Sequence, residues 1–304
     1  MLIRLMTTAD LAHCLARWPL PDLPPAVAKS TLERAFRQQR VRGAVIQDPA
    51  TLRVLGFGMS GFVRGANVLG LATSGMPMVA SHVIREIRSE PVYLDEAEMT
   101  RAQRCDDLHL CVIAYRQQTY DPRDPIALEL MHAGHSAFRL MHEGFVLQGV
   151  WQEGLPSDHE WMNAGGLLVK HRTAGSDAQP RWLYGALRED VATSWPSHTL
   201  GYVLRRSTRR LGLSAAQCRV AELALWNLDD EHVARRLSIS PATVRRHWRG
   251  IFERLDTSEV LKDDATETGD RAASTRATST RRGPERRGRI LNYLRTHLHE
   301  IRPA

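Results

Sequence analysis

The sequence predicts an α+β protein in which a mixed α/β N-terminal domain is followed by a small all-α domain. Three observations support this fold class. Residues 1 to 200 alternate between short apolar strands and amphipathic helices, residues 213 to 256 hold three short amphipathic helices, and most of the excess positive charge lies around those helices. A chain of 304 residues is long enough for two such domains.

The elements of the N-terminal domain, residues 1 to 200, follow one another in a clear order. LIRLM is a strand, TTADLAHCLARW is a helix, and GAVIQD and VLGFGMSGFV form a strand pair with a turn around Pro49. LHLCVIAY is a continuous apolar run typical of a central buried strand. The next helix has Asp124 and Pro125 at its start and Gly144 as its C-cap. FVLQGVW and RWLYGAL are predicted strands, whereas the rest of residues 155 to 200 is not assigned.

Residues 207 to 261 are predicted to form a helix-turn-helix domain. The turn at 238 to 240 is tight, Ser240 is expected to cap the helix that follows, and Pro241 suits its first position. This helix buries a face with spacings of four, three and four residues, which consists of Val244, Trp248, Ile251 and Leu255. The second helix of such a motif enters the major groove of DNA.

The charge distribution also favours DNA binding by this domain. Between Arg205 and Arg254 there are 11 arginines and five acidic residues, a net charge of +6, whereas the whole chain carries +7. Arg245, Arg246 and Arg249 share the exposed face of the predicted recognition helix. The alternative is an ordinary solvated face, and the sequence does not separate base contacts from phosphate contacts.

The segments LSAAQCRVAELALWNL, VARRLSISPATVRRH and IFERLD resemble the LuxR-type DNA-binding domain of bacterial transcription regulators over residues 213 to 256. This resemblance adds Ser240, Thr243 and His247 to the DNA-binding candidates, although Thr243 and His247 could instead serve in capping or packing. The sequence departs from the family at Gln217, Ala221 and Asn227. Asn is a good replacement for Gly in a left-handed C-cap, so the turn at Asn227 should be kept. The family positions matched are Val233, Ala234, Leu237, Ile239, Ser240, Thr243, Val244 and His247.

The order of elements in the N-terminal domain, with IRLMTTADL at its start, resembles the GNAT acetyltransferase superfamily. That family holds the acyl-CoA pyrophosphate in a glycine-rich loop after the central strand, whereas the corresponding loop here, RQQTYDPRDP, has no glycine. We therefore expect no acyl transfer, no catalytic residue and no cofactor, so that the protein is not an enzyme. The alternative is a GNAT acetyltransferase targeted by its DNA-binding module, and a third hypothesis is an architectural DNA-bound protein.

The sequence contains two groups of residues of types that bind metals, one of histidines and one of cysteines. His132, His135 and His142 fall near one face of a predicted helix and form a weak candidate for a metal site, but a partly buried histidine face is the favoured interpretation, so no metal is predicted. The four cysteines, at 14, 105, 111 and 218, lack CxxC spacing. They are interpreted as reduced thiols rather than as disulfides or a zinc ribbon.

The C-terminal part is predicted to contain a disordered linker, residues 262 to 288, and an amphipathic helix, residues 289 to 303. Residues 263 to 288 contain no Val, Ile, Leu, Met or aromatic residue. The helix has an apolar stripe that something must cover, formed by Ile290, Leu294, Leu298 and Ile301. We predict that this stripe joins two copies in a homodimer, with docking on the same chain as the alternative.

The sequence thus predicts a cytoplasmic, bacterial-type transcription regulator that binds double-stranded DNA. The N-terminal domain is expected to bind an effector, either a small molecule or a protein. No stretch is apolar enough to span a bilayer and the N-terminus has no apolar signal region, so no membrane partner is expected.

Overall fold

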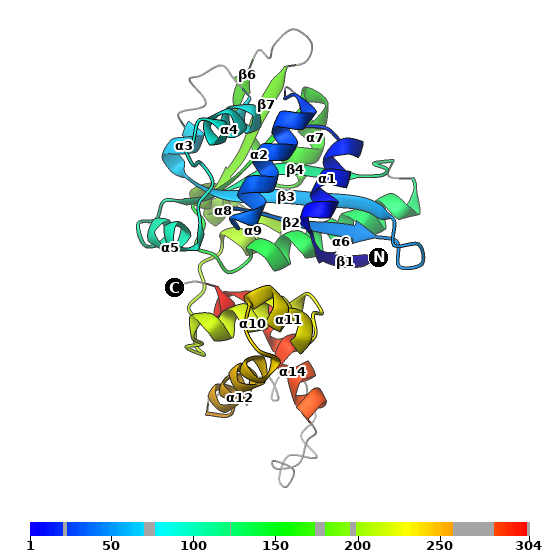
Figure 1. Ribbon diagram of the computed structural model, residues 1–304. Coiled ribbons are helices and arrows are strands. Elements are labelled where there is room, and N and C mark those ends of the chain that lie inside the picture. The colour runs from blue at the N-terminus through cyan, green and yellow to red at the C-terminus, as the bar shows by residue number, and fades with distance from the viewer. Residues whose placement is uncertain are drawn as a thin grey trace. The chain divides into compact units, whose positions relative to one another are not determined.

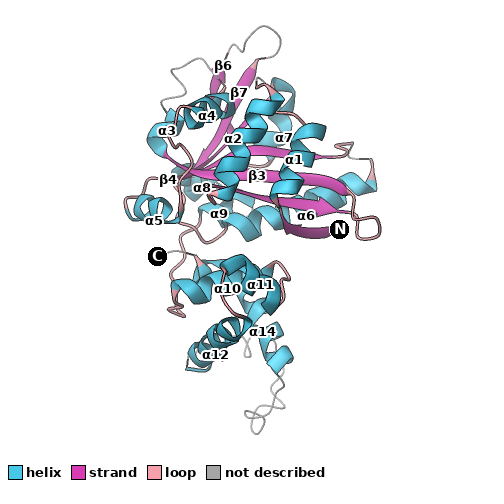
Figure 2. Ribbon diagram, viewed as in Figure 1, coloured by secondary structure: helices cyan, strands magenta, loops and turns pink. Residues whose placement is uncertain are grey.

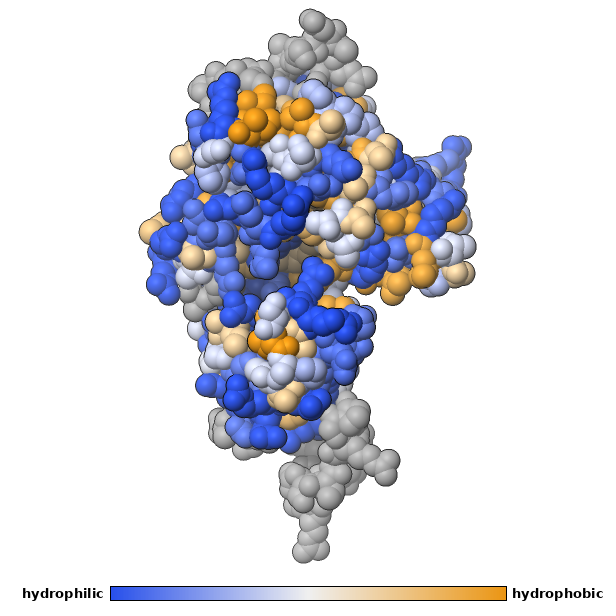
Figure 3. Space-filling model, viewed as in Figure 1, coloured by the Kyte–Doolittle hydropathy of each residue, from blue (hydrophilic) through white to orange (hydrophobic). Residues whose placement is uncertain are grey.

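The computed structural model describes residues 1–20, 23–69, 77–121, 123–173, 180–194, 199–257 and 283–302. The chain forms two compact units, residues 1–205 and residues 206–303. Hydrophilic side chains cover most of the visible face of both units (Figure 3). Each unit is described by itself below.

Unit 1 is built on a seven-stranded sheet of order β1-β2-β3-β4-β5-β7-β6. Every pair of neighbouring strands is antiparallel except β4 and β5, which are parallel. Together with its helices, this is a mixed α/β fold (Figures 1 and 2). The strands are β1 (Leu2–Leu5), β2 (Val41–Gln47), β3 (Val54–Arg64), β4 (Leu108–Gln117), β5 (Gly149–Gly154), β6 (Leu168–Thr173) and β7 (Arg181–Leu187).

Helices cover both faces of this sheet, and Figure 1 shows α1 and α2 on the opposite side from α6. The first face is covered by α1 (Thr8–Arg17), α2 (Pro25–Arg37) and α4 (Met78–Ile87), with the short α3 (Gly65–Leu69) beside them. The second face is covered by α5 (Glu96–Arg104), α6 (Pro125–His142), η1 (Pro156–Asp158), α7 (His159–Ala164), α8 (Arg188–Ser194) and α9 (Thr199–Leu204).

Strand β4 runs through the middle of the sheet, and its neighbouring residues face opposite layers. Cys111 packs in the core under α1, α2 and α4, whereas Leu110 and Val112 pack in the core under α5 and α9. This alternation follows from the two-residue period of a strand. The continuous apolar run LHLCVIAY is therefore explained by burial on both faces.

The predicted strand FVLQGVW is wrong in its first half, because β5 begins only at Gly149. Gly144 has a φ of 92° and turns the chain out of α6. Phe145 and Leu147 are fully buried in the core under α5 and α9 without belonging to a strand. Their apolar character reflects that burial rather than a sheet position.

The described part of unit 2 consists of helices and one 3₁₀ turn. They are α10 (Ala215–Leu225), α11 (Asp230–Leu237), α12 (Pro241–Thr257), α14 (Gly283–Thr296) and η2 (Leu298–Ile301). The first three have the order expected of a helix-turn-helix domain. Among the described residues, no helix combines the length and the apolar character needed to cross a bilayer.

The C-terminal segment differs from the prediction in two respects. Helix α14 begins at Gly283, inside the predicted linker, and ends at Thr296, after which η2 forms a separate turn. The remainder of the linker, residues 262 to 282, lies outside the described residues. The predicted stripe of Ile290, Leu294, Leu298 and Ile301 is buried, each side chain at most 2% exposed, and both elements pack against α10.

The stripe is therefore covered by unit 2 of the same chain. This agrees with the alternative of docking on the same chain, and the stripe does not form the predicted dimer contact. Polar contacts hold it there: the Glu300 carboxylate accepts the backbone N–H groups of Arg210 and Leu211, and Arg302 donates to Glu222 at 2.6 Å. Burying each of the four apolar side chains contributes roughly 1.5–3 kcal/mol. Dimerisation itself stays a prediction, and it needs a different surface.

Candidate functional site: a cavity in unit 1 and a basic helix in unit 2

The sheet of unit 1 opens between β4 and β5. The two strands pair from His109 with Gly149 to Val112 with Gln152, but β4 continues to Gln117. The pairing of β3 with β4 also shifts register between Met59 and Ser60, at the level where the strands diverge. The edge of β4 beyond Val112 is thus left without β5, and side chains bond to part of it: Arg116 donates to the carbonyl oxygen of Tyr115 at 3.0 Å, and the N–H of Gln117 donates to Tyr120 Oη at 3.2 Å.

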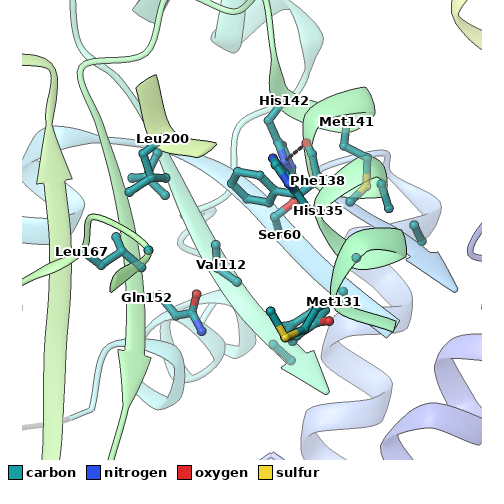
Figure 4. Close-up of a pocket in the computed structure, with 18 of the residues that line it drawn as sticks. Ser60, Val112, Met131, His135, Phe138, Met141, His142, Gln152, Leu167 and Leu200 are labelled. Atoms are coloured by element: carbon teal, nitrogen blue, oxygen red, sulfur yellow. Dashed lines mark hydrogen bonds between the residues drawn. The ribbon is translucent and has the colours of Figure 1, made fainter. Parts of the chain in front are cut away.

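A cavity of about 390 Å³ lies at this divergence, between the sheet, α6, α7 and the start of α9. Its wall is mostly apolar, and Figure 4 shows Leu167 and Leu200 across from the histidines of α6. A volume of this size suits a small ligand or one end of a longer one. Its apolar lining includes Val112, Met131, Phe138, Met141, Leu167 and Leu200.

A serine and a histidine form a buried polar pair in the cavity wall. Ser60 Oγ lies 2.6 Å from His142 Nε2, and His142 Nδ1 lies 2.8 Å from the carbonyl oxygen of Phe138. The carbonyl can only accept, so Nδ1 carries the proton and Nε2 accepts from the serine hydroxyl. Both ring nitrogens of His142 are therefore used, and Ser60 is held at a fixed position on β3.

His135 differs from His142, because its Nε2 is buried and has no hydrogen-bond partner among the described residues. Burial, and next the positive charge of Arg139, lower the pKa of His135 below its usual 6.5. The ring is therefore neutral at pH 7; it lines the cavity, while its Nε2 atom is buried in the cavity wall. An unpartnered buried polar atom is costly, so a ligand that bonds to it would gain affinity.

The structure does not bring the three predicted histidines together as a metal site. Both ring nitrogens of His142 are already engaged, by Ser60 and by the carbonyl oxygen of Phe138. In the described residues there is no group of three or more histidine, cysteine and acidic side chains that could hold a metal ion.

The N-terminus of α6, where the glycine-rich loop of the resembled family would lie, is capped by a carboxylate. Asp124 accepts the N–H of Ile126 at 2.9 Å, and Pro125 has no N–H to offer. Asp121 just before it is paired with Arg123. A helix N-terminus attracts anions, but here the chain's own negative charge occupies that position.

The turn between α11 and α12 has the geometry that the sequence predicted. Ser238 is left-handed, with a φ of 54°, and ends α11. Ser240 Oγ accepts the N–H of Thr243 at 3.1 Å and so caps α12; it also lies 2.9 Å from Thr243 Oγ1. The buried face of α12 is the predicted one: Val244, Trp248, Ile251 and Leu255 are each at most 3% exposed.

Arg245, Arg246 and Arg249 lie on the exposed face of α12. None of the three has a hydrogen-bond or ion-pair partner within the described part of the chain. Long cationic side chains held on one helix face without partners are free to contact an external anion. His247 is half-buried on the same helix, between the exposed and the buried face.

The three departures from the LuxR pattern keep the local structure of unit 2. Gln217 completes a capping box with Ser214, accepting the Ser214 N–H at 2.8 Å. Its amide nitrogen lies against Gly250, where any Cβ would meet it at 2.5 Å. Asn227 adopts a φ of 61°, the left-handed conformation expected there, and Ala221 is buried.

Residues of α14 that were predicted to belong to the linker contact α11 and α12. The guanidinium of Arg287 lies 4.5 Å from the ring centroid of Trp248 and pairs with Asp230 at 2.7 Å. The guanidinium of Arg286 lies 4.8 Å from the ring of Phe252. Unit 2 is thus a helix-turn-helix core braced by its own C-terminal segment.

No family model matches the chain, and no curated protein does so either. Among solved structures, it is similar to a mosquito arylalkylamine N-acetyltransferase-like protein 5b, with 10% identity, coverage of 61% of this chain and 99% of that chain, and a TM-score of 0.38. A mutant of the spermidine N-acetyltransferase SpeG from Vibrio cholerae has 6% identity, coverage of 62% and 95%, and a TM-score of 0.36. NAA60 of Arabidopsis thaliana, in complex with a bisubstrate analogue, has 8% identity, coverage of 61% and 97%, and a TM-score of 0.36.

These comparisons contradict the expectation that the protein is not an enzyme, because the similar structures are those of N-acetyltransferases or a protein like them. That expectation is not retained. The likeness lies in the fold of unit 1, and the comparisons give no support to the LuxR resemblance of unit 2.

Neither Ser60 nor the unpartnered nitrogen of His135 could be predicted from the sequence as part of a cavity. A serine inside the glycine-rich strand VLGFGMSGFV is unremarkable until the fold places α6 over it. The polar residue in an otherwise apolar strand core was the only signal. Its pairing with a histidine 82 positions later depends on tertiary structure.

Proposed function

We propose that the protein is an acyltransferase-type enzyme that its helix-turn-helix unit holds on DNA. The observation that carries the first half is the cavity at the divergence of β4 and β5, with the unpartnered Nε2 of His135 in its wall. The exposed arginines of α12 carry the second half. The finer LuxR-type assignment belongs to this proposal and rests on the sequence pattern.

In this proposal an acyl group lies in the apolar cavity, with its carbonyl near the unpaired edge of β4. Backbone N–H groups at that edge would polarise the carbonyl oxygen as the acceptor attacks it. His135 Nε2 would take the proton that an amine acceptor must lose, because a neutral imidazole is a suitable general base near pH 7. Ser60 and His142 would line the polar end of the cavity without exchanging protons with solvent.

The donor is expected to gain little from a diphosphate. Since Asp124 already occupies the N-terminus of α6, a diphosphate there would meet a carboxylate instead of free N–H groups. We therefore propose a donor that is recognised through its acyl and thioester end. Acetyl-CoA and S-acetylpantetheine, which share that end, should bind with affinities within about threefold of each other.

The test is a thermal-shift titration of the full chain with both thioesters, followed by an acyl-transfer assay with polyamines and with peptides carrying a free amino group. Transfer should fall at least about 100-fold in His135→Ala, since general-base catalysis contributes about that factor. His13→Ala, an exposed histidine of α1, is the matched control and should leave transfer unchanged.

The rate should also depend on pH through His135. Because burial lowers the pKa of His135 below 6.5, the loss of rate that protonation of this ring causes should have its midpoint below pH 6.5. If neither thioester shifts the melting temperature and no transfer is detected, the enzymatic half of the proposal is refuted. The DNA-binding half is tested separately by the variants of α12 described in the Discussion.

A further inference from the structure

A cluster of soft donor atoms lies on the other face of β4 from the cavity. Cys111 Sγ is 3.9 Å from Met78 Sδ and 3.8 Å from His82 Nδ1. Cys111 and His82 are fully buried, and Met78 is 2% exposed. None of the three contributes to the cavity or to the proposed transfer reaction.

The local structure brings these donors together. Met78 and His82 are four residues apart on α4 and therefore lie on one face of that helix. Cys111 comes from β4, on the strand face that α4 covers. The start of α4 is fixed by Glu153, whose carboxylate accepts the backbone N–H groups of Met78 and Val79.

The hydrogen bond of His82 Nε2 supports a role for His82 Nδ1 as a metal ligand. His82 Nε2 lies 3.4 Å from the carbonyl oxygen of Asn67, which suits a proton on Nε2 and leaves the lone pair of Nδ1 facing Cys111. Metal-bound histidines commonly donate their other N–H to a carbonyl in this way. Burial lowers the pKa of His82 to about 4, so the ring is neutral, the form that binds metals.

We propose that Cys111, His82 and Met78 form a three-coordinate site for a soft monovalent metal ion, and that the ion is Cu(I). Ligand bonds of about 2.3 Å to sulfur and 2.0 Å to nitrogen, spread at 120°, separate sulfur from nitrogen by about 3.7 Å and two sulfurs by about 4.0 Å. The observed separations of Cys111 Sγ from His82 Nδ1, 3.8 Å, and from Met78 Sδ, 3.9 Å, match two sides of this triangle.

The donor set selects the ion. A thioether is a soft ligand that suits Cu(I), whereas magnesium, calcium and manganese prefer oxygen donors. Binding exchanges the thiol proton of Cys111 for the metal: the S–H bond breaks, a sulfur–copper bond forms, the proton is released, and copper stays Cu(I). The thiolate and the monovalent ion together carry no net charge, which a buried apolar site tolerates.

The test is an anaerobic titration of the reduced full chain with Cu(I) supplied as its bathocuproine disulfonate complex. The background is Cys105→Ser, which removes the exposed thiol. We expect the protein to take copper from bathocuproine disulfonate and to bind one ion per chain. X-ray absorption should report two sulfur ligands and one imidazole nitrogen.

Three variants in the Cys105→Ser background distinguish a copper site from ordinary core packing of the same side chains. Met78→Leu keeps the volume and removes the thioether, so it should weaken copper binding at least about tenfold while circular dichroism stays unchanged. Cys111→Ser should abolish it. Cys14→Ser, a buried thiol elsewhere in the same core, is the matched control and should bind as the background does.

The proposal fails if Met78→Leu binds copper as tightly as the background, or if X-ray absorption finds fewer than two sulfur ligands. It also fails if the background cannot compete with bathocuproine disulfonate. Should Cys111→Ser not fold, Met78→Leu and the absorption spectrum decide the question alone.

Discussion

Helices α6 and α12 begin in the same way and differ in one side chain. Each has a proline at its first position, Pro125 and Pro241, and a polar cap before it, Asp124 and Ser240. Asp124 accepts the N–H of Ile126 with a carboxylate, whereas Ser240 accepts the N–H of Thr243 with a neutral hydroxyl. The partial positive charge at the start of α6 is neutralised by the carboxylate of Asp124, whereas the start of α12 keeps its partial positive charge.

Because of this difference, the two helix starts should differ in their attraction for anions. The start of α12 stands beside exposed arginines that have no partner in the described residues, so an external phosphate would meet positive charge from both sources. The start of α6 offers a negative charge instead. The cavity behind it therefore has to recognise its ligand through apolar contacts and the free nitrogen of His135.

The largest effect should come from the arginines of α12. Arg245→Ala and Arg249→Ala should each weaken DNA binding by about 1 to 3 kcal/mol if the side chain forks onto a base, and by less if it contacts only phosphate. Arg37→Ala, which removes the same charge from unit 1, is the control. Mobility shifts on a selected site measure this, and unchanged affinity in both variants would refute the assignment of α12 as the DNA-facing helix.

Converting the cap of α12 into that of α6 should give the next largest effect. Ser240→Asp keeps a good N-cap but places a carboxylate where a phosphate is expected, so DNA affinity should fall about tenfold with little change in stability. Ser240→Asn keeps the cap without the charge and should bind nearly as the parent does. Equal affinities for the Asp and Asn variants would show that no phosphate approaches this helix start.

The reverse change in α6 should have a smaller effect. Asp124→Asn removes the carboxylate and keeps a capping side chain, so the N-terminus of α6 regains its attraction for anions. The affinity for acetyl-CoA relative to S-acetylpantetheine should rise about fivefold, measured by calorimetry. A ratio that does not move would place the diphosphate away from α6.

The smallest effect concerns stability, where the two caps should be alike. Ser240→Ala and Asp124→Ala each remove one hydrogen bond to a helix N–H, and each should lower the free energy of unfolding by about 1 kcal/mol. Urea denaturation followed by circular dichroism measures both. A much larger loss for Asp124→Ala would mean that the carboxylate has a further structural role.

Much of the local structure could be predicted because it depends on residues close in sequence. The cap at Ser240, the left-handed Asn227 and the start of α6 at Asp124 are set by side-chain chemistry within a few positions. The apolar face of α12 was predicted from its spacing for the same reason. The run from Phe145 was misassigned, because burial makes loop and strand residues equally apolar.

The sequence by itself determined the two-part organisation, the central strand, the caps and the basic face of α12, since composition and periodicity act locally. Only the tertiary structure decided what covers each surface. It placed the stripe of the C-terminal helix against α10, Ser60 against His142, and Cys111 against two residues of α4. Those pairs are separated by tens of residues, and the packing of helices on a sheet or on one another joins them through contacts that no local pattern records.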